Sequence, residues 1–124
     1  MMLTLLLTFV STAPAATLTV GGSGTYATIQ DAIDAAAPGD TVEVSSGTYT
    51  ENIDFSGKDI TVESVSGSAV TILSPATSGL GVVNFDEGEE AVLDGFGIEP
   101  ATGERGVYIS NSSPVIRNCR IEGA

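Results

Sequence analysis

The chain has 124 residues, of which 42% are apolar, and it carries 4 Lys and Arg against 16 Asp and Glu, a formal net charge of −12. It has no His and a single Cys, which excludes histidine-based catalytic triads, zinc fingers and disulfide frameworks. The acidic balance also argues against a nucleic acid as partner, because phosphate binding requires Lys and Arg. The length and apolar content predict one folded acidic domain.

The first residues, MMLTLLLTFV, form a short apolar run that is followed by small residues at Ala13 and Ala15. This pattern predicts a secretory signal peptide over residues 1–15, with cleavage after Ala15. The run is shorter than the roughly 20 apolar residues that span a membrane. We therefore expect a secreted, periplasmic or cell-surface protein with no membrane span after signal removal. Because no Lys or Arg precedes the run, a buried first strand and a misassigned start codon remain alternatives.

Residues 16–40 are predicted to form a strand and a capping helix. The strand covers residues 17–20, and the helix covers residues 28–37. Thr28 is a good N-cap, Asp31 lies three positions later, and Pro38 with Gly39 ends the helix. Apolar side chains recur at helical spacing, namely at Ile29, Ala32, Ile33 and Ala36. A helix this short must lie on an apolar surface to be stable.

From residue 41 onward the apolar residues alternate as they do in strands. The pattern predicts strands over residues 41–44, 60–65 and 82–85, separated by Ser-Gly pairs at 46–47, 56–57, 66–67 and 78–79. Short strands at this spacing are typical of a sandwich, a closed barrel or a solenoid.

An internal repeat favours the solenoid. Residues 92–99 (VLDGFGIE) match residues 115–122 (VIRNCRIE) at an offset of 23, and residues 81–85 match 106–109 at an offset of 24 or 25. Gly95 and Asn118, which readily adopt positive φ, occupy the same place in both copies. We therefore predict about 3–4 coils over residues 41–124, with Leu93 stacked on Ile116. An immunoglobulin-like sandwich is the alternative, but it explains neither the helix nor the repeat.

A family resemblance rests on three stretches of the sequence. Residues 26–44 (YATIQDAIDAAAPGDTVEV) and 47–51 (GTYTE) resemble the start of right-handed parallel β-helix proteins of the pectin lyase-like superfamily. Residues 113–121 (SPVIRNCRI) resemble one of its coil repeats. The resemblance implies an all-β solenoid, a right-handed parallel β-helix with an N-terminal α-helical cap. Because members usually have eight or more coils, we expect the C-terminal end to be uncapped and the coils of residues 41–124 to be truncated.

An acidic run supplies the candidate metal ligands. Pectate lyases of this superfamily bind calcium through carboxylates, so Asp86, Glu87, Glu89 and Glu90 are weak calcium candidates. A solvated acidic turn is the preferred interpretation, because consecutive carboxylates on a flexible loop repel one another. No catalytic residue and no other cofactor is assigned.

The basic residues are the next candidates. Lyases of the superfamily use Arg or Lys as a base, which brings Arg117 and Arg120 into consideration. We expect both to lie at the surface, pairing with Glu99 or Glu122 of adjacent turns. Lys58 is interpreted as a turn residue.

The remaining candidates have ordinary structural interpretations. Cys119 aligns with Phe96 and is expected to be a buried core residue. Asn111-Ser112-Ser113 fits a glycosylation acceptor, which would matter in a eukaryotic host. Three tyrosines could stack on sugar rings or cap the core with the hydroxyl in water: Tyr26, Tyr49 and Tyr108.

Two functions are compatible with these residues. The chain is expected to be a secreted or surface module that binds or scaffolds extracellular polysaccharide. The alternative is the N-terminal part of a polysaccharide lyase or glycoside hydrolase whose catalytic coils lie beyond Ala124.

Overall fold

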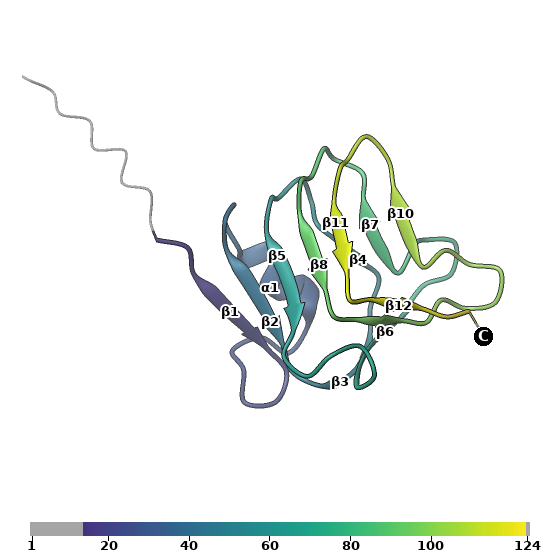
Figure 1. Ribbon diagram of the computed structural model, residues 1–124, viewed down its shortest axis with the longest axis horizontal. Helices are drawn as coiled ribbons and strands as arrows, with labels where there is room; N and C mark the ends of the chain where they lie inside the picture. The colour runs from purple at the N-terminus through teal and green to yellow at the C-terminus, as the bar shows by residue number, and fades with distance from the viewer. Residues whose placement is uncertain (1–13, 124) are drawn as a thin grey trace, which may run out of the picture.

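Strands from successive turns of the chain lie side by side and parallel throughout residues 14–123, the part that the computed structural model describes (Figure 1). The chain is a parallel β-solenoid of about four turns, which confirms the predicted fold class. The sandwich alternative is wrong, since that architecture is built from antiparallel sheets. Most of the predicted signal peptide lies in residues 1–13, outside the described residues.

The elements in chain order are β1 (Thr17–Val20), α1 (Ile29–Ala35), β2 (Thr41–Val44), β3 (Gly47–Thr50), β4 (Ile53–Asp54), β5 (Thr61–Ser64), β6 (Thr71–Ser74), β7 (Val83–Phe85), β8 (Val92–Asp94), β9 (Gly97–Ile98), β10 (Val107–Ile109), β11 (Val115–Arg117) and β12 (Arg120–Ile121). They build three parallel sheets. Sheet A has the order β1-β2-β5-β8-β11, sheet B the order β12-β9-β6-β3, and sheet C the order β10-β7-β4. Successive turns of the chain thus add their strands to the same three sheets.

The predicted repeat is confirmed in the register of the last two turns. Leu93 pairs with Ile116 in sheet A, and Ile98 pairs with Ile121 in sheet B, both at the predicted offset of 23. In sheet C, Val107 pairs with Val83, so the offset there is 24. Like residues therefore stack on like residues along the axis of the solenoid.

In sheet A the earlier turns do not keep this period, although sheet B stays close to it with offsets of 24 and 25. Thr61 lies 20 residues after its partner Thr41, and Val92 lies 31 residues after its partner Thr61. The long turn contains two extended corners, residues 65–70 and residues 75–82, where the first turn has two residues at each corner. Because loops lie outside the stacked strands, their length can vary without disturbing the register.

In the last two turns, the corners between sheets A and B are turned by residues with positive φ. Gly95 has φ 87° and Asn118 has φ 54°, as their shared place in the repeat predicts. The expected break at residues 46–47 is different, because Gly47 is already the first residue of β3. The corner there consists of Ser45 and Ser46, so this Ser-Gly pair spans the boundary between a two-residue corner and the next strand.

The interior of the solenoid is filled by side chains that alternate along each strand. Leu93, Phe96 and Ile98 have no exposed surface, and Phe55 lies against Phe85 with ring centroids 4.4 Å apart. In the last turn Ile116 is half-buried and Ile121 is 53% exposed. Within residues 14–123, no further strand covers that turn.

The helix α1 lies against β1, β2 and β4 and closes the first turn (Figure 1). It is shorter than the predicted 28–37, because the backbone is already extended at Ala36. The predicted cap is confirmed: the Thr28 hydroxyl accepts a hydrogen bond of 3.1 Å from the Asp31 N–H. The buried face consists of Ile29, Ala32 and Ile33.

Two charged side chains from the coils hold the ends of α1. The Glu51 carboxylate accepts hydrogen bonds from the N–H groups of Ile29 (2.8 Å) and Gln30 (3.0 Å). At the other end, Lys58 Nζ donates to the carbonyls of Ile33 and Asp34, each at 2.8 Å. The expectation that Lys58 is simply a turn residue is therefore wrong. Glu51 places negative charge at the N-terminal end of α1 and Lys58 places positive charge at its C-terminal end, as the helix dipole favours.

Among the described residues, no helix has the length and apolar character needed to span a membrane.

Candidate functional site

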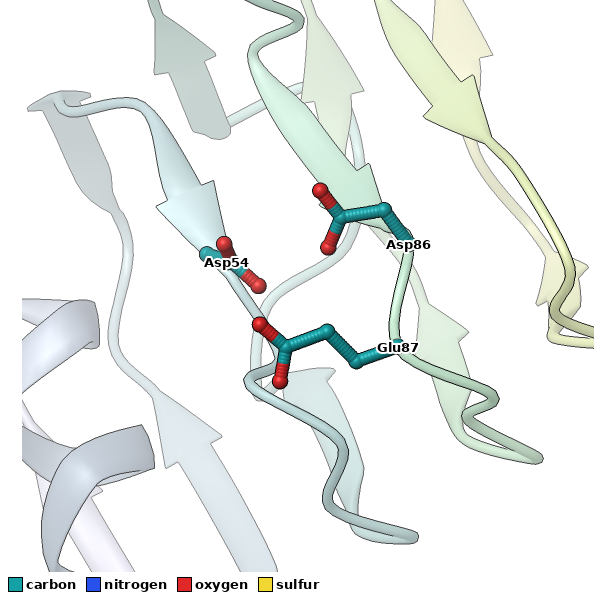
Figure 2. A group of neighbouring side chains, drawn as sticks. All are labelled: Asp54, Asp86 and Glu87. Atoms are coloured by element: carbon teal, nitrogen blue, oxygen red, sulfur yellow. The ribbon is translucent and has the colours of Figure 1, made fainter.

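Three carboxylates meet on the outer side of sheet C, and Figure 2 shows them pointing toward one another. Asp54 lies at the end of β4, while Asp86 and Glu87 follow directly after β7. One oxygen from each of the three carboxylates lies within 4.8 Å of the other two. Asp54 is half-buried, and the other two side chains are exposed. The site thus joins two consecutive turns of the solenoid.

The pairing of β4 with β7 creates this arrangement. Ile53 pairs with Val83, and both side chains are buried. Because side chains alternate along a strand, Asp54 and its partner Asn84 point outward. Asp86 comes two residues after Asn84 and so extends along the same side.

The Asp54 end of the site is held by hydrogen bonds. Its Oδ1 accepts from the Ser56 N–H at 2.8 Å, within a turn in which Ser56 has φ 55°. The Asp54 N–H donates to Gln30 Oε1 at 2.8 Å, and Gln30 Nε2 donates to the Asp54 carbonyl at 3.0 Å. The Gln30 amide therefore pairs with the free edge of β4 as another strand would, and fixes Asp54 in place.

The donor set fits a hard divalent cation. Calcium takes six to eight oxygen ligands, and three carboxylates can supply up to six. Without a cation, each pair of these charges repels by roughly 1 kcal/mol at the dielectric constant of water. Asp54, Asp86 and Glu87 are the residues that would hold such an ion, which would supply positive charge for an anionic ligand.

Two of the four predicted calcium candidates belong to this group, and two do not. Asp86 and Glu87 take part, whereas Glu89 and Glu90 lie outside it. Glu90 is exposed, and its N–H donates to Asp59 Oδ1 at 2.8 Å.

Glu89 departs most from the predicted solvated turn, because it is fully buried. Its carboxylate accepts hydrogen bonds from the N–H groups of Gly57 (3.0 Å) and Glu87 (3.1 Å) and from Ser112 Oγ (2.6 Å). Burial raises the pKa of this carboxyl, but the hydrogen bonds outweigh burial and hold its pKa below the usual range. Glu89 thus links three turns of the solenoid, and the expectation of a solvated acidic turn is wrong at this position.

Asp54 is the member of the site that the sequence pattern did not reveal. It lies 32 residues before Asp86 in a turn whose length differs from the 23-residue repeat. Aligning β4 with β7 requires knowledge of the long corner at residues 75–82. The one available sequence signal was the alternation of Ile53, Asp54 and Phe55, which predicts an outward-facing Asp54 if the segment is a strand.

A second row of charge runs along sheet A. Glu43, Glu63 and Asp94 are register partners on neighbouring strands, and Arg117 follows them in β11. Arg117 Nε lies 2.9 Å from Asp94 Oδ2. Hydrogen bonds from Asn118 and Arg117 hold the pKa of Asp94 below its usual range.

The arginines lie at the surface as predicted, and one of the two expected partners, Glu122, takes part in an ion pair. Arg117 pairs with Asp94 of the preceding turn rather than with a glutamate. Arg120 Nε lies 3.6 Å from Glu122 Oε1, which is two residues further along the same chain segment. Both pairs are solvent-exposed and contribute little stability.

The remaining candidates have structural roles. Cys119 is half-buried rather than buried, because no later coil covers it among the described residues. The Tyr49 hydroxyl donates to the Ser45 carbonyl at 2.7 Å, and burial together with the charge of Glu51 raises its pKa. Arg105 lies 5.2 Å from the ring centroid of Tyr108. Tyr26 packs against the core, and Asn111 is exposed with φ 52°.

Within residues 14–123, the carboxylates of Asp54, Asp86 and Glu87 are the one group of three or more acidic or Cys side chains close enough to share an ion. Compared with the models of protein families and with the curated proteins, the chain matches none of them.

Proposed function

We propose that the chain is a secreted β-solenoid module that binds acidic extracellular polysaccharide with the help of a calcium ion. The observation that carries this proposal is the convergence of Asp54, Asp86 and Glu87 on an exposed face of two consecutive turns. A cation held there can also contact the carboxylates of a uronic acid chain, because calcium takes more oxygen ligands than the protein supplies.

The charge of the chain supports a cation-dependent mode of binding. With a net charge of −12, the protein repels an anionic polysaccharide unless positive charge is placed between them. Asp86 and Glu87 are exposed, so a ligand can approach the cluster from solvent.

The resemblance to pectin lyase-like proteins supports the same proposal. The parallel β-solenoid agrees with that superfamily, and membership and the right-handed winding form part of what we propose. The superfamily is rich in proteins that bind or process polysaccharides of uronic acids. The three sheets provide a stiff scaffold on which the outward side chains keep fixed positions.

Calcium titration of the 124-residue chain by isothermal calorimetry tests the first half of the proposal. Asp54→Asn and Glu87→Gln each remove one charged ligand, and we expect each to weaken calcium binding at least tenfold. Glu90→Gln is the matched control, because it removes the same charge from the same loop outside the cluster. Absence of calcium binding at millimolar concentration, or equal weakening by the control, would contradict the metal site.

Retention of the chain on immobilised polygalacturonate tests the second half. We expect retention with calcium, release by a chelator, and loss of retention in Asp54→Asn. Retention that is unchanged by the chelator would contradict calcium-bridged binding while leaving polysaccharide binding in place.

The alternative is that the chain begins a polysaccharide lyase or glycoside hydrolase. One observation favours it: Asp54 lies on a strand, as the calcium ligands of pectate lyases usually do, although Asp86 and Glu87 lie in a loop. The absorbance of unsaturated product, measured on polygalacturonate with calcium, tests for lyase activity in these residues. Steady turnover would overturn the binding module, whereas a constant absorbance is expected both from the binding module and from an enzyme whose catalytic coils lie beyond residue 124.

A further inference from the structure

Ala16 is held by the fold on both sides of its backbone. Its N–H donates to Asp40 Oδ1 at 2.8 Å, and its carbonyl accepts from the Thr41 N–H at 2.9 Å. Through these bonds the residue extends the pairing of β1 with β2 by one position. Pro14, Ala15 and Ala16 are all exposed, so the peptide bonds in this segment are open to solvent.

Asp40 is the less exposed partner in this contact, with 9% of its surface accessible. Its second oxygen, Oδ2, accepts from the Ala37 N–H at 2.9 Å, at the end of the capping helix. The hydrogen bonds from Ala16 and Ala37 hold the pKa of Asp40 below its usual range, so the carboxylate is ionised at neutral pH. The fold thus fixes a negative charge against the backbone nitrogen of Ala16.

We propose that the Ala15–Ala16 peptide bond is a processing site, and that cleavage creates an N-terminal ammonium at Ala16 that forms an ion pair with Asp40. The proposal rests on the predicted signal peptide. Cleavage is a hydrolysis by a membrane peptidase that accepts small residues: water gives its hydroxyl group to the Ala15 carbonyl and a proton to the Ala16 nitrogen. The released amine takes up a further proton from solvent and becomes an ammonium.

Two independent observations meet at this bond. The sequence places an Ala-x-Ala cleavage pattern at residues 13–15, and the structure places the carboxylate of Asp40 at the nitrogen of the next residue. Cleavage one bond earlier or later would move the ammonium by about 3.3 Å along the chain, to the opposite edge of the extended segment and away from Asp40. Asp40 therefore matches one N-terminus, and the ion pair stabilises the processed chain relative to its precursor.

N-terminal sequencing and intact mass of the chain secreted from a bacterial host test the processing site. We expect the secreted chain to begin at Ala16. A different first residue, or a secreted chain that retains residues 1–15, would overturn the proposal. This readout is independent of any calcium or polysaccharide binding, so it can fail while the proposed function stands.

Chemical unfolding of secreted variants tests the ion pair. One extra alanine inserted after Ala15 keeps the pattern of residues 13–15 but adds a second Ala-x-Ala pattern that ends at Ala16, so the secreted variant is sequenced first. In the chain that begins at the added alanine, the ammonium is displaced by one residue and the Ala16 N–H is retained. We expect this insertion to raise the unfolding equilibrium constant by about threefold to tenfold, the range for a well-placed ion pair. An unchanged unfolding constant would overturn the ion pair.

Asp40→Asn completes the comparison by removing the charge at the other partner. We expect Asp40→Asn to lower the free energy of unfolding more in the chain that starts at Ala16 than in the chain with the extra alanine. Asp31→Asn, at an exposed aspartate of α1, should lower it equally in both chains. Equal effects of Asp40→Asn in the two chains would contradict the proposal. If Asp40→Asn does not fold, the acylation rate of the terminal amine decides. The ion pair predicts slower acylation at Ala16 than at the displaced terminus, and equal rates would contradict it.

Discussion

Residues 92–98 and residues 115–121 carry the same apolar pattern and the same backbone bend, yet they end in different environments. Leu93 and Ile98 have no exposed surface, whereas their register partners Ile116 and Ile121 are half-buried and 53% exposed. The difference lies in the neighbours, because the first of these coils is covered from both sides and the second from one side among residues 14–123. Equal sequence patterns therefore do not imply equal contributions to stability in a solenoid.

The largest effect is expected from truncating matched inward residues. Leu93→Ala should lower the free energy of unfolding by roughly 3 kcal/mol, because it leaves a cavity in a closed core. Ile116→Ala should cost roughly 1 kcal/mol, since the half-buried side chain loses less contact. Urea unfolding followed by circular dichroism measures both. Equal losses would show that the last coil is covered in solution, and the comparison would fail.

A second test concerns the link between the last coil and the one before it. Glu89→Ala removes the acceptor of three hydrogen bonds, and we expect a loss of roughly 2 to 3 kcal/mol. Ser112→Ala removes one of the three donors and should cost roughly 1 kcal/mol. A loss on Ser112→Ala as large as that on Glu89→Ala would show that the last coil carries more of this network than the hydrogen bonds indicate.

The same carboxylate gives the protein an acid sensitivity. Because the pKa of Glu89 is lower in the folded state than in the unfolded state, its stabilisation is complete above the unfolded pKa of about 4.3. It is lost as the pH falls through the folded pKa. The stability of Glu89→Gln, measured by urea unfolding between pH 7 and pH 3, should therefore fall less steeply than that of the unchanged chain. Parallel pH profiles would contradict this role.

Substitutions at the two bends should further distinguish the contributions of the two coils to stability. Gly95→Ala should cost roughly 1 to 2 kcal/mol, because Gly95 has φ 87° and a methyl group there would overlap the Ser64 hydroxyl. Asn118→Gly, at φ 54° in the last coil, relieves the left-handed backbone but removes the hydrogen bond from Asn118 Nδ2 to Asp94 Oδ1. These opposing effects should change the stability by less than about 0.5 kcal/mol. Thermal unfolding distinguishes the two variants, and a larger loss at Asn118 would contradict the prediction.

The smallest effect is expected at the surface of sheet A. Arg117→Ala removes the ion pair with Asp94 and should cost less than about 1 kcal/mol at low salt. The loss should shrink as salt is added, because the pair is exposed and screened. A loss that does not depend on salt would show that Arg117 stabilises the last coil by packing rather than by charge.

Local patterns were sufficient to predict much of the fold. The N-cap at Thr28, the positive φ at Gly95 and Asn118, and the stacking of Leu93 on Ile116 are confirmed. Each depends on residues close in sequence, or on two copies of one motif with little change between them. The short strands β3 and β6 were missed although they pair at an offset of 24, close to that of the repeat, because β3 (GTYT) shows no alternation of apolar residues.

The candidate site was harder to predict from sequence. Asp86 and Glu87 are adjacent in an acidic run, so the sequence alone identified them as candidate calcium ligands. Asp54 joins them through the pairing of β4 with β7, which depends on the long corner at residues 75–82. Glu89 belongs to the same run, yet it is buried and bonded to Ser112 and Gly57 from other turns.

The spacing of apolar residues and backbone sterics were enough to predict the repeat of the last two coils, the capping helix and the bends at Gly95 and Asn118. Which carboxylates are held by hydrogen bonds and which stay exposed depends on contacts between residues far apart in sequence, which only the stacked turns bring together. Glu51, Glu89 and Asp40 accept hydrogen bonds from backbone N–H groups of other turns, whereas Asp86 and Glu87 remain exposed. The sequence does not distinguish these carboxylates from one another. The stacking of turns brings backbone N–H groups from distant residues to some of them and leaves the others exposed to solvent.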